Sequence, residues 1–446
     1  MSAIGILGIL IGIVLLIWLT VKGVHVVVLA PLCALIVIVM NQMAPLTAIT
    51  EAFMGGTVGL FQNLFFILLF GSIFAAIFEK SGAALSIVNG ILSVFAGKID
   101  LRSRRGTLTC VTAMIVISAI FMFGGLDAMS ELITVFPICL AMCKKMNVSR
   151  NLVPALAFST GVWAVCAPGA PQAANSLAAG LCGTASTAGL VPGLVASIVM
   201  AVATIIYLNW EFQRSIKKGE IFESIPTDPD MSDERKTPNF FVSIIPLVAI
   251  FVFYNIAKLP LFVAVIIGVV LAMVLFAPTL YAGEKGKFGE LLAVLERGCN
   301  TGVRITVIAA VLAGFGAVVS NTPTFQPLMG ALGSSKMPVI ILCLLIVAVV
   351  CAVTSNSNGG IQIALNITMP LAQSANVSMA ALHRVAVFSA ASLNTLPTNP
   401  GVMIVCQLAG VPVKKAYRPL FVTTVVLPFI GALIVALMYM AIPGMA

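Results

Sequence analysis

The chain has 446 residues, of which 60% are hydrophobic and only 9% are charged, and its mean hydropathy is +1.14. Soluble chains carry about 25% charged residues, so this composition excludes an ordinary water-soluble globular protein. The formal net charge of +9 therefore bears on membrane topology rather than on nucleic-acid binding. Repeated apolar stretches of roughly 20 residues predict an all-α polytopic membrane protein.

Uninterrupted transmembrane spans are predicted at 3–21, 24–40, 59–78, 187–208, 240–256, 259–277, 302–320 and 420–441. Two amphipathic segments, 44–57 and 288–300, each precede a span, and we expect both to lie in the membrane interface. The one substantial hydrophilic stretch, 211–238, divides the chain near its middle.

Four further apolar stretches are interrupted by Gly, Pro and polar residues. The interruptions are FGGLD (123–127), APGAP (167–171), SNSNGG (355–360) and LNTLPTNPG (393–401). Unpaired backbone groups in lipid cost several kcal/mol each, so irregular backbone survives only inside protein or beside a water-filled cavity. The sequence therefore predicts that these breaks surround a functional site.

The two halves of the chain resemble each other. FGGLDAMSELITVFP (123–137) aligns with NSNGGIQIALNITMP (356–370), and LAFSTGVWAVCAPGAP (156–171) aligns with VAVFSAASLNTLPTNP (385–400). Each half predicts five crossings, one of them discontinuous, and one re-entrant hairpin. Five is odd, so the halves are expected to be inverted repeats, a transporter architecture. The predicted units are 1–210, a cytoplasmic linker at 211–238, and 239–446.

The basic residues test this topology. Twenty of the 24 Lys and Arg residues fall on one predicted side, in segments around Lys22 and at 80–105, 144–150, 211–238, 280–297 and 414–418. The other side holds Lys258, Lys336 and Arg384, while Arg304 lies just inside a span. The positive-inside rule makes the first side cytoplasmic, so both termini are expected to be external.

The breaks predict a binding site for a small polar anion. Glycines let the backbone turn and approach a ligand, and restarting half-helices present positive dipole ends to a carboxylate. The predicted substrate-binding residues are Gly124, Gly125, Asp127, Pro168, Gly169, Gln172, Asn175, Ser355, Asn356, Ser357, Asn358, Gly359, Gly360, Gln362, Asn394, Thr395, Thr398 and Asn399.

Asp127 and Glu131 are the candidates for carrying a coupling ion. They are four residues apart and share a helix face, and carboxylates inside a membrane usually mark ion or proton paths. The alternative for Asp127 is that it only caps the returning half-helix. His25 and His383 fall near span ends and are expected to be structural.

No enzyme chemistry is evident in the sequence. It contains no GxxxxGK[ST] motif for ATP, no HExxH metal motif and no GxSxG nucleophile elbow. The ten cysteines are scattered through apolar spans and are expected to be small buried hydrophobes. We therefore expect neither a metal site nor an enzyme.

At its breaks the sequence resembles the gluconate permease family of the ion-transporter superfamily, most closely the branch of D-β-hydroxybutyrate permeases. The resemblance rests on FGGLDAMSELITVFP, APGAPQAANS (167–176), SNSNGGIQIAL (355–365) and SLNTLPTNPGVMIV (392–405), and it spans nearly the whole chain. Gluconate-type members have a His in the Pro-rich break of the first repeat, where this chain has APGAP. That difference favours a smaller hydroxy- or keto-monocarboxylate.

The resemblance implies proton symport, a location in the bacterial cytoplasmic (inner) membrane and a homodimer. We therefore expect a secondary active transporter that imports a small organic (hydroxy)monocarboxylate, such as 3-hydroxybutyrate or a gluconate-like acid. It would use the proton motive force and no cofactor, and its partners would be the substrate anion and the bilayer, with no nucleic acid. A sodium-coupled carboxylate symporter is the nearest alternative, because Ser- and Asn-rich tips also suit Na⁺, and an anion channel is less favoured.

Overall fold

The computed structural model describes the chain except for residues 1–2, 22–23, 88–89, 91–99, 127, 226–236, 283–285, 326, 328–336, 355–356, 398 and 443–446. The described residues form helices and loops, and no strand occurs among them. The predicted all-α class is therefore confirmed.

The helices of the first half begin and end close to the predicted positions. They are α1 (Ala3–Val21), α2 (Val26–Met40), α3 (Pro45–Thr47), a π-helical stretch (Ala48–Phe53), α4 (Met54–Ser81), α6 (Arg104–Phe123), α7 (Ala128–Met146), α8 (Val153–Cys166), α9 (Ala173–Cys182) and α10 (Leu190–Lys217). Helix α10 continues to Lys217, so the first residues of the predicted linker are helical.

The second half repeats this order of elements. Its helices are α11 (Phe240–Asn255), α12 (Leu261–Leu275), α13 (Ala277–Leu280), α14 (Gly286–Ser320), α16 (Val339–Thr354), α17 (Ser357–Ser374), α18 (Met379–Leu393), α19 (Pro400–Leu408), α20 (Val413–Phe421), a π-helical stretch (Val422–Val426) and α21 (Leu427–Ala441). Three of the predicted breaks, FGGLD, APGAP and LNTLPTNPG, fall between two helices. The fourth, SNSNGG, is different, because α17 begins at Ser357 and includes Gly359 and Gly360, while 355–356 lie outside the described residues.

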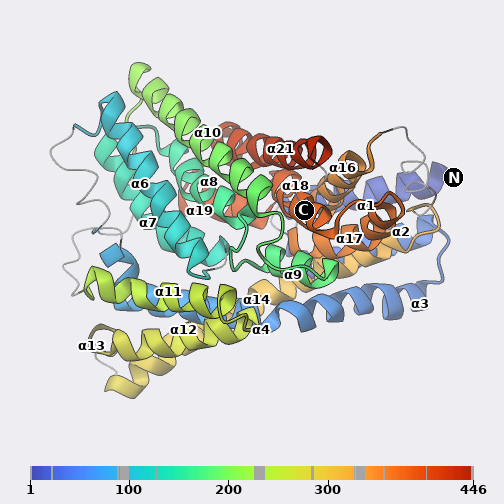
Figure 1. Ribbon diagram of the computed structural model, residues 1–446, viewed down its shortest axis with the longest axis horizontal. Coiled ribbons are helices and arrows are strands. Elements are labelled where there is room, and N and C mark those ends of the chain that lie inside the picture. The colour runs from blue at the N-terminus through green and yellow to red at the C-terminus, as the bar shows by residue number, and fades with distance from the viewer. Residues whose placement is uncertain are drawn as a thin grey trace.

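By their contacts the helices form two groups, and Figure 1 shows α4, α11, α12 and α14 of the first group along the lower side of the molecule. In the first group α4 packs along α14, α2 packs on α14, and α12 packs on α4, with α1 and α11 beside α2 and α12. In the second group α6, α7, α8 and α10 contact one another, as do α16, α17, α18 and α21, and α10 joins the two sets through α21. The contacts of one half are thus matched by equivalent contacts of the other.

Close backbone approach between α4 and α14 depends on glycine. A Cβ atom on Gly302 would lie 2.7 Å from the Leu69 Cα, and one on Gly314 would lie 2.7 Å from the Phe53 carbonyl oxygen. Small residues at helix interfaces allow this approach inside membranes, where the hydrophobic effect between helices is weak. The α4–α14 pair therefore forms a tightly packed framework on which the rest of the first group is assembled.

Among the described residues, four helical segments are long and apolar enough to cross a membrane: α6, α10, α14 and Val413–Ala441. A fifth is the bent pair Pro45–Gln62 and Phe65–Ser81, whose axes differ by 48°. Several shorter apolar helices of 10–17 residues accompany them. The predicted amphipathic segment 288–300 is continuous with its span, because α14 runs from Gly286 to Ser320.

Candidate functional site

The first turn of α17 lies against the break between α18 and α19. Helix α17 starts at Ser357, and Asn394 Nδ2 donates a hydrogen bond to Ser357 Oγ. Gly359 and Gly360 are buried in the first turn of α17. A Cβ atom on Gly359 would lie 3.3 Å from the Ala313 Cβ on α14, so this turn packs closely on the framework helix.

The α18–α19 break is held in shape by its own side chains. Asn399 Oδ1 caps α19 by accepting from Gly401 N at 2.7 Å and Val402 N at 3.3 Å, as an N-cap residue should. Asn399 Nδ2 donates to the Asn394 carbonyl at 2.9 Å. Thr395 Oγ1 donates to the Thr424 carbonyl at 2.8 Å. Polar side chains thus satisfy backbone groups that the missing helical turn leaves without partners.

The side-chain oxygen of Asn394 differs from the groups above in its hydrogen bonding. The Oδ1 atom of Asn394 is buried, and it has no hydrogen-bond partner among the described residues. A buried acceptor without a donor costs about 1–3 kcal/mol. Within the described part of the chain, Asn394 Oδ1 is therefore a candidate ligand atom beside the first turn of α17.

A cavity of about 530 Å³ lies between α17 and the framework helices, within the roughly 300–1,000 Å³ typical of small-molecule sites. From α17 it is lined by Gly359, Gln362 and Asn366, which lie in successive turns, and from α4 by Gly56. None of its lining residues, all in the described part of the chain, is charged. The cavity therefore offers neutral amide and hydroxyl groups along α17, from its electropositive N-terminal turn at Gly359 to Leu371 near its C-terminal end.

A smaller cavity of about 300 Å³ adjoins the first one, because Asn321 lines both. It lies beside the π-helical stretch before α4 and includes Thr47 and Glu51. The two cavities together lead from the beginning of α4, along α14 and α17, to the hairpin tip.

The break between α8 and α9 is filled by protein. The Arg384 side chain from α18 is fully buried. Its Nη1 donates to the Cys166 carbonyl at 3.0 Å, its Nη2 donates to Ser186 and Ala188 at 3.0 and 2.7 Å, and its Nε donates to Ala188 at 2.9 Å. Arg384 is therefore a buried residue that holds this break together, and its predicted place on the external side stays a prediction.

His383 completes the contact between the halves. Its side chain is fully buried; Nε2 lies 3.0 Å from Asn175 Oδ1 and Nδ1 lies 2.7 Å from Thr184 Oγ1. Asn175 Nδ2 in turn donates to the Ala170 and Ser186 carbonyls. Asn175 and His383 thus hold the α8–α9 break and the following loop in one hydrogen-bonded unit.

The predicted residues of the first half stabilise turns and helix contacts. Gln172 Nε2 donates to the Met122 and Leu126 carbonyls at 2.9 and 2.8 Å, which ties the α8–α9 break to the first hairpin tip. Gly125 has a φ of +87°, and a Cβ atom there would lie 2.5 Å from Ile250 on α11. Gly124 likewise packs on α11, through Leu247.

Pro168 and Gly169 are buried within the same break. Gly169 has a φ of +76° and donates its N–H to the Ser186 carbonyl at 3.1 Å. Pro168 packs on α10, since a Cβ atom on Gly193 would lie 2.5 Å from the Pro168 Cγ. Both residues are thus part of the arrangement around Arg384 rather than of the cavity lining.

Glu131 on α7 is 1% exposed. A Cβ atom on Gly161 of α8 would lie 3.4 Å from its Oε2, so the carboxyl group lies at the α7–α8 contact. Asn358 is partly buried in the first turn of α17. Four of the predicted site residues lie outside the described residues, namely Asp127, Ser355, Asn356 and Thr398.

Of the predicted site residues, Gly359 and Gln362 line the main cavity, and Ser357, Asn394 and Asn399 are linked beside it. Sequence reasoning missed Asn366 and Asn321, which also line the cavity. Asn366 was detectable, because it lies four residues after Gln362 and so shares a helix face with it. Asn321 lies just past the end of α14, and no motif marks it.

Long apolar helices, interrupted helices in both halves and a polar cavity beside one interruption define a multi-pass membrane transporter. The comparisons with known proteins also identify a membrane transporter. The family model of the GntP family permeases matches residues 4–441, so the chain belongs to this family and is a transporter rather than an enzyme. An uncharacterized transporter of Bacillus subtilis (strain 168), YxjC, is 23% identical over 466 residues, which cover 94% of this chain and 95% of YxjC.

Proposed function

We propose that this permease is a secondary active transporter that imports a small organic hydroxy-monocarboxylate, such as 3-hydroxybutyrate or a gluconate-like acid, by proton symport. The observation that carries the proposal is the cavity of about 530 Å³ along α17, which reaches the first turn of that helix at Gly359. A carboxylate there would be attracted by the positive end of the α17 dipole. The amide groups of Gln362, Asn366 and Asn321 would bond its oxygens and hydroxyl groups.

The proposed transport unit is a pair of inverted repeats, 1–210 and 239–446, joined by a cytoplasmic linker at 211–238, with both termini external. Its support is the matching order of helices and the reciprocal contacts of the two halves. In this scheme α6–α7 and α16–α17 are re-entrant hairpins, and α8–α9 and α18–α19 are discontinuous crossings. The cavities at the start of α4 and the end of α14 then open toward the external face.

Movement of the second group of helices against the first would carry substrate across the membrane. The main cavity lies at the boundary between the groups, because α17 supplies one wall and α4 and α14 the other. We extend the proposal to a homodimer in the bacterial cytoplasmic membrane.

Proton coupling is assigned to Asp127 and Glu131. Support comes from Glu131, a carboxyl group that is buried at the α7–α8 contact. A carboxylate inside a membrane is costly and is usually retained for ion or proton movement. Protonation would remove its charge before the surrounding helices move.

Sodium coupling is the second candidate, and one observation favours it. The buried Asn394 Oδ1 has no hydrogen-bond partner among the described residues, and amide and carbonyl oxygens suit a hard cation such as Na⁺. The Asn394 carbonyl and the Ser357 hydroxyl lie nearby. A cation bound there would hold the hairpin tip against the α18–α19 break.

The test is uptake of labelled 3-hydroxybutyrate into proteoliposomes under an imposed pH gradient, acid outside, without sodium. Accumulation that a protonophore abolishes would support proton symport, and competition by gluconate and lactate would then define specificity. Uptake only when sodium is present would show that Na⁺, rather than the proton, is the coupling ion. No uptake in either condition would refute the assignment of a short hydroxy acid.

A further inference from the structure

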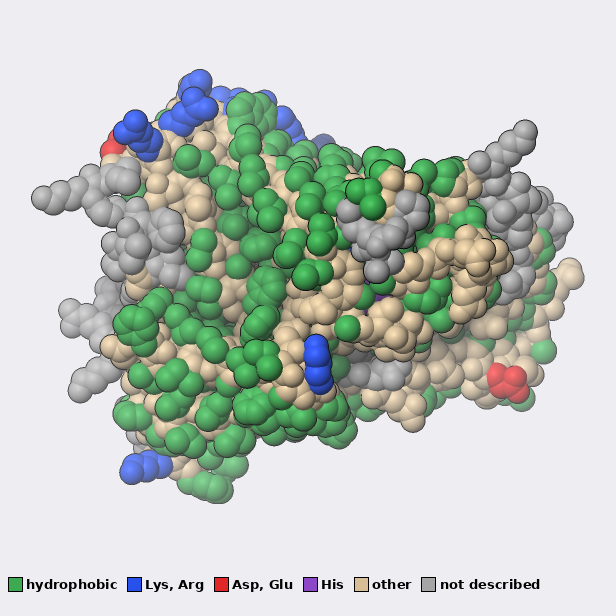
Figure 2. All heavy atoms as spheres, in the orientation of Figure 1, with side chains coloured by type: hydrophobic (Ala, Val, Ile, Leu, Met, Phe, Trp, Pro, Cys, Tyr) green, Lys and Arg blue, Asp and Glu red, His purple; other side chains and the backbone are tan. Residues whose placement is uncertain are grey.

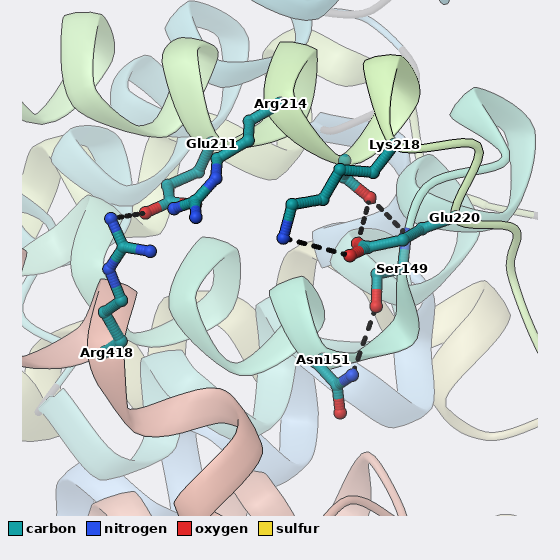
Figure 3. A network of polar contacts seen from close by, with 8 residues as sticks. Ser149, Asn151, Glu211, Arg214, Lys218, Glu220 and Arg418 are labelled. Atoms are coloured by element: carbon teal, nitrogen blue, oxygen red, sulfur yellow. Dashed lines mark hydrogen bonds and ion pairs between the residues drawn. The ribbon is translucent and has the colours of Figure 1, made fainter.

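A third cavity, separate from the two described above, lies where the end of α10 meets α20. Its volume is about 150 Å³. Its charged lining residues are Glu211, Arg214, Lys218, Glu220, Lys415 and Arg418. We call it the basic pocket, because its lining has four cationic side chains and two carboxylates, a net charge of +2. Figure 3 shows most of these side chains directed toward one another.

The cations of the basic pocket are not tightly paired. The closest nitrogen–oxygen distances are 3.6 Å for Arg418–Glu211, 3.9 Å for Arg214–Glu211 and 3.8 Å for Lys218–Glu220. A charge-assisted hydrogen bond is about 2.7–2.9 Å long. Lys415 makes no ion pair within the described part of the chain. The pocket therefore keeps N–H donors that its own carboxylates do not fully use.

Ion pairs elsewhere on the molecule are shorter. Lys80–Glu290 and Arg297–Glu79 each have a nitrogen–oxygen distance of 2.9 Å, so the long distances are particular to the basic pocket. The pocket carboxylates are instead held by hydroxyl groups. Both the Glu211 and the Glu220 carboxylate accept a hydrogen bond of 2.8 Å, from Tyr207 Oη and Ser215 Oγ respectively.

The basic pocket lies at the end of an apolar, exposed helix surface. Ile198, Val202, Ile206 and Trp210 of α10 are 58%, 49%, 62% and 48% exposed. Residues four apart are neighbours on a helix, and Arg214 continues this row into the pocket. Figure 2 shows Lys and Arg side chains gathered at the edge of the molecule near the end of α10, beside hydrophobic side chains. Aliphatic residues occupy the hydrocarbon core of a bilayer, aromatic residues its interface, and basic residues the flanking aqueous layer, so the order along α10 matches a helix leaving the membrane.

Trp210 connects the apolar row to the pocket. Its ring lies under two guanidinium groups, with the Arg214 Cζ 5.4 Å and the Arg418 Cζ 5.7 Å from the ring centroid. Such cation–π contacts are favourable within about 6 Å. They hold both arginines over the interfacial tryptophan, so that their remaining N–H groups are presented at the level where lipid head groups lie.

We propose that the basic pocket binds the phosphate group of an anionic phospholipid whose acyl chains lie along the apolar row of α10. Phosphate matches the donors, because arginine bonds phosphate oxygens in a planar, bidentate geometry and lysine adds a point charge. Basic pockets between membrane helices are known to bind anionic head groups. A soluble phosphate has the same head-group chemistry but would gain nothing from the exposed row that ends at Trp210.

The test uses the purified full chain in detergent, titrated with phosphatidylglycerol or phosphatidylcholine and followed by native mass spectrometry. The first phosphatidylglycerol is expected to bind about tenfold more tightly than the first phosphatidylcholine. The double variant Lys218→Gln/Lys415→Gln should lose this preference to within about twofold. The matched control is Lys217→Gln/Lys414→Gln, which removes the same charge from exposed neighbours outside the pocket lining and should keep the preference.

A third variant, Glu220→Gln, raises the net charge of the pocket from +2 to +3 and should tighten binding of the first phosphatidylglycerol about fivefold. It keeps an acceptor for Ser215, so folding is preserved. Equal weakening in the two double variants would mean diffuse surface attraction and would overturn the proposal, as would no wild-type preference or no tightening by Glu220→Gln. Displacement of the lipid by inorganic phosphate at tenfold molar excess would identify a soluble ligand and overturn the lipid assignment.

Discussion

Replacement of Arg384 by methionine is expected to destabilise the permease more than any other single change of a charged residue to an apolar one. The guanidinium group donates to three carbonyls, of Cys166, Ser186 and Ala188, at 2.7–3.0 Å. Its side chain is fully buried, and no carboxylate pairs with it among the described residues. Methionine fills a similar volume but donates no hydrogen bond.

The magnitude follows from the carbonyls of Cys166 and Ala188, since the Ser186 carbonyl keeps donors in Gly169 N and Asn175 Nδ2. Each buried acceptor left without a donor costs about 1–3 kcal/mol, so the loss of free energy of unfolding has an upper range of about 2–6 kcal/mol. The substitution also removes the cost of burying a charge, which brings the expected loss to about 3 kcal/mol. At about 2 °C per kcal/mol for a long chain, the midpoint of thermal unfolding should fall by about 6 °C.

The assay is thermal unfolding in detergent, followed by loss of the monodisperse peak in size-exclusion chromatography. Arg384→Lys should be intermediate, because one ammonium group cannot reach all three carbonyls. Arg304→Met is the matched control, since Arg304 is exposed on α14, and it should change the midpoint by less than about 2 °C. Equal midpoints for Arg384→Met and Arg304→Met would refute the role of Arg384 as the donor that closes the α8–α9 break.

Gly302→Ala should abolish the monodisperse peak, because its Cβ would lie 2.7 Å from backbone of α4, whereas Gly55→Ala, which meets nothing within 4 Å, should leave the peak unchanged. Asn399→Ala should cost about 1 kcal/mol through the lost cap of α19 and weaken apparent substrate affinity; unchanged affinity in uptake assays would place the site elsewhere. Gln172→Glu removes the amide that donates to two carbonyls of the first hairpin tip, so uptake per inserted protein should fall about tenfold, and normal uptake would make this link dispensable. Asp127→Asn should insert normally but lose proton-driven accumulation, and full accumulation would remove Asp127 from the coupling mechanism.

The positions of the breaks were predictable because backbone chemistry is local. Clustered proline, glycine and polar residues weaken a helix through the chemistry of the local backbone. Helices end and restart at FGGLD, APGAP and LNTLPTNPG, whereas Gly359 and Gly360 lie within α17. The same reasoning found Gly359 and Gln362, which line the cavity. Asn399 was predicted to bind substrate, and the structure shows in addition that its side chain caps α19.

The function of Arg384 was not predictable in this way. In the sequence it is one basic residue near the start of an apolar stretch, which charge counting assigns to an external segment. Its burial depends on carbonyls from a region 196–218 positions earlier in the chain, and no local pattern records that pairing. The continuity of α14 was missed because a local signal was misleading. Gly298 and Gly302 look like a helix boundary in the sequence, but they lie inside α14 and pack against α4.

The dependence of the first break on Arg384 has a consequence for biosynthesis. Chains are made and inserted from the N-terminus, so Cys166 enters the membrane 218 residues before Arg384 is synthesised. Until then the end of α8 lacks the donor that it has in the finished protein. The α8–α9 break therefore reaches its final form only after α18 is inserted. Two separately produced halves would consequently have to meet in the bilayer before either acquired its native structure.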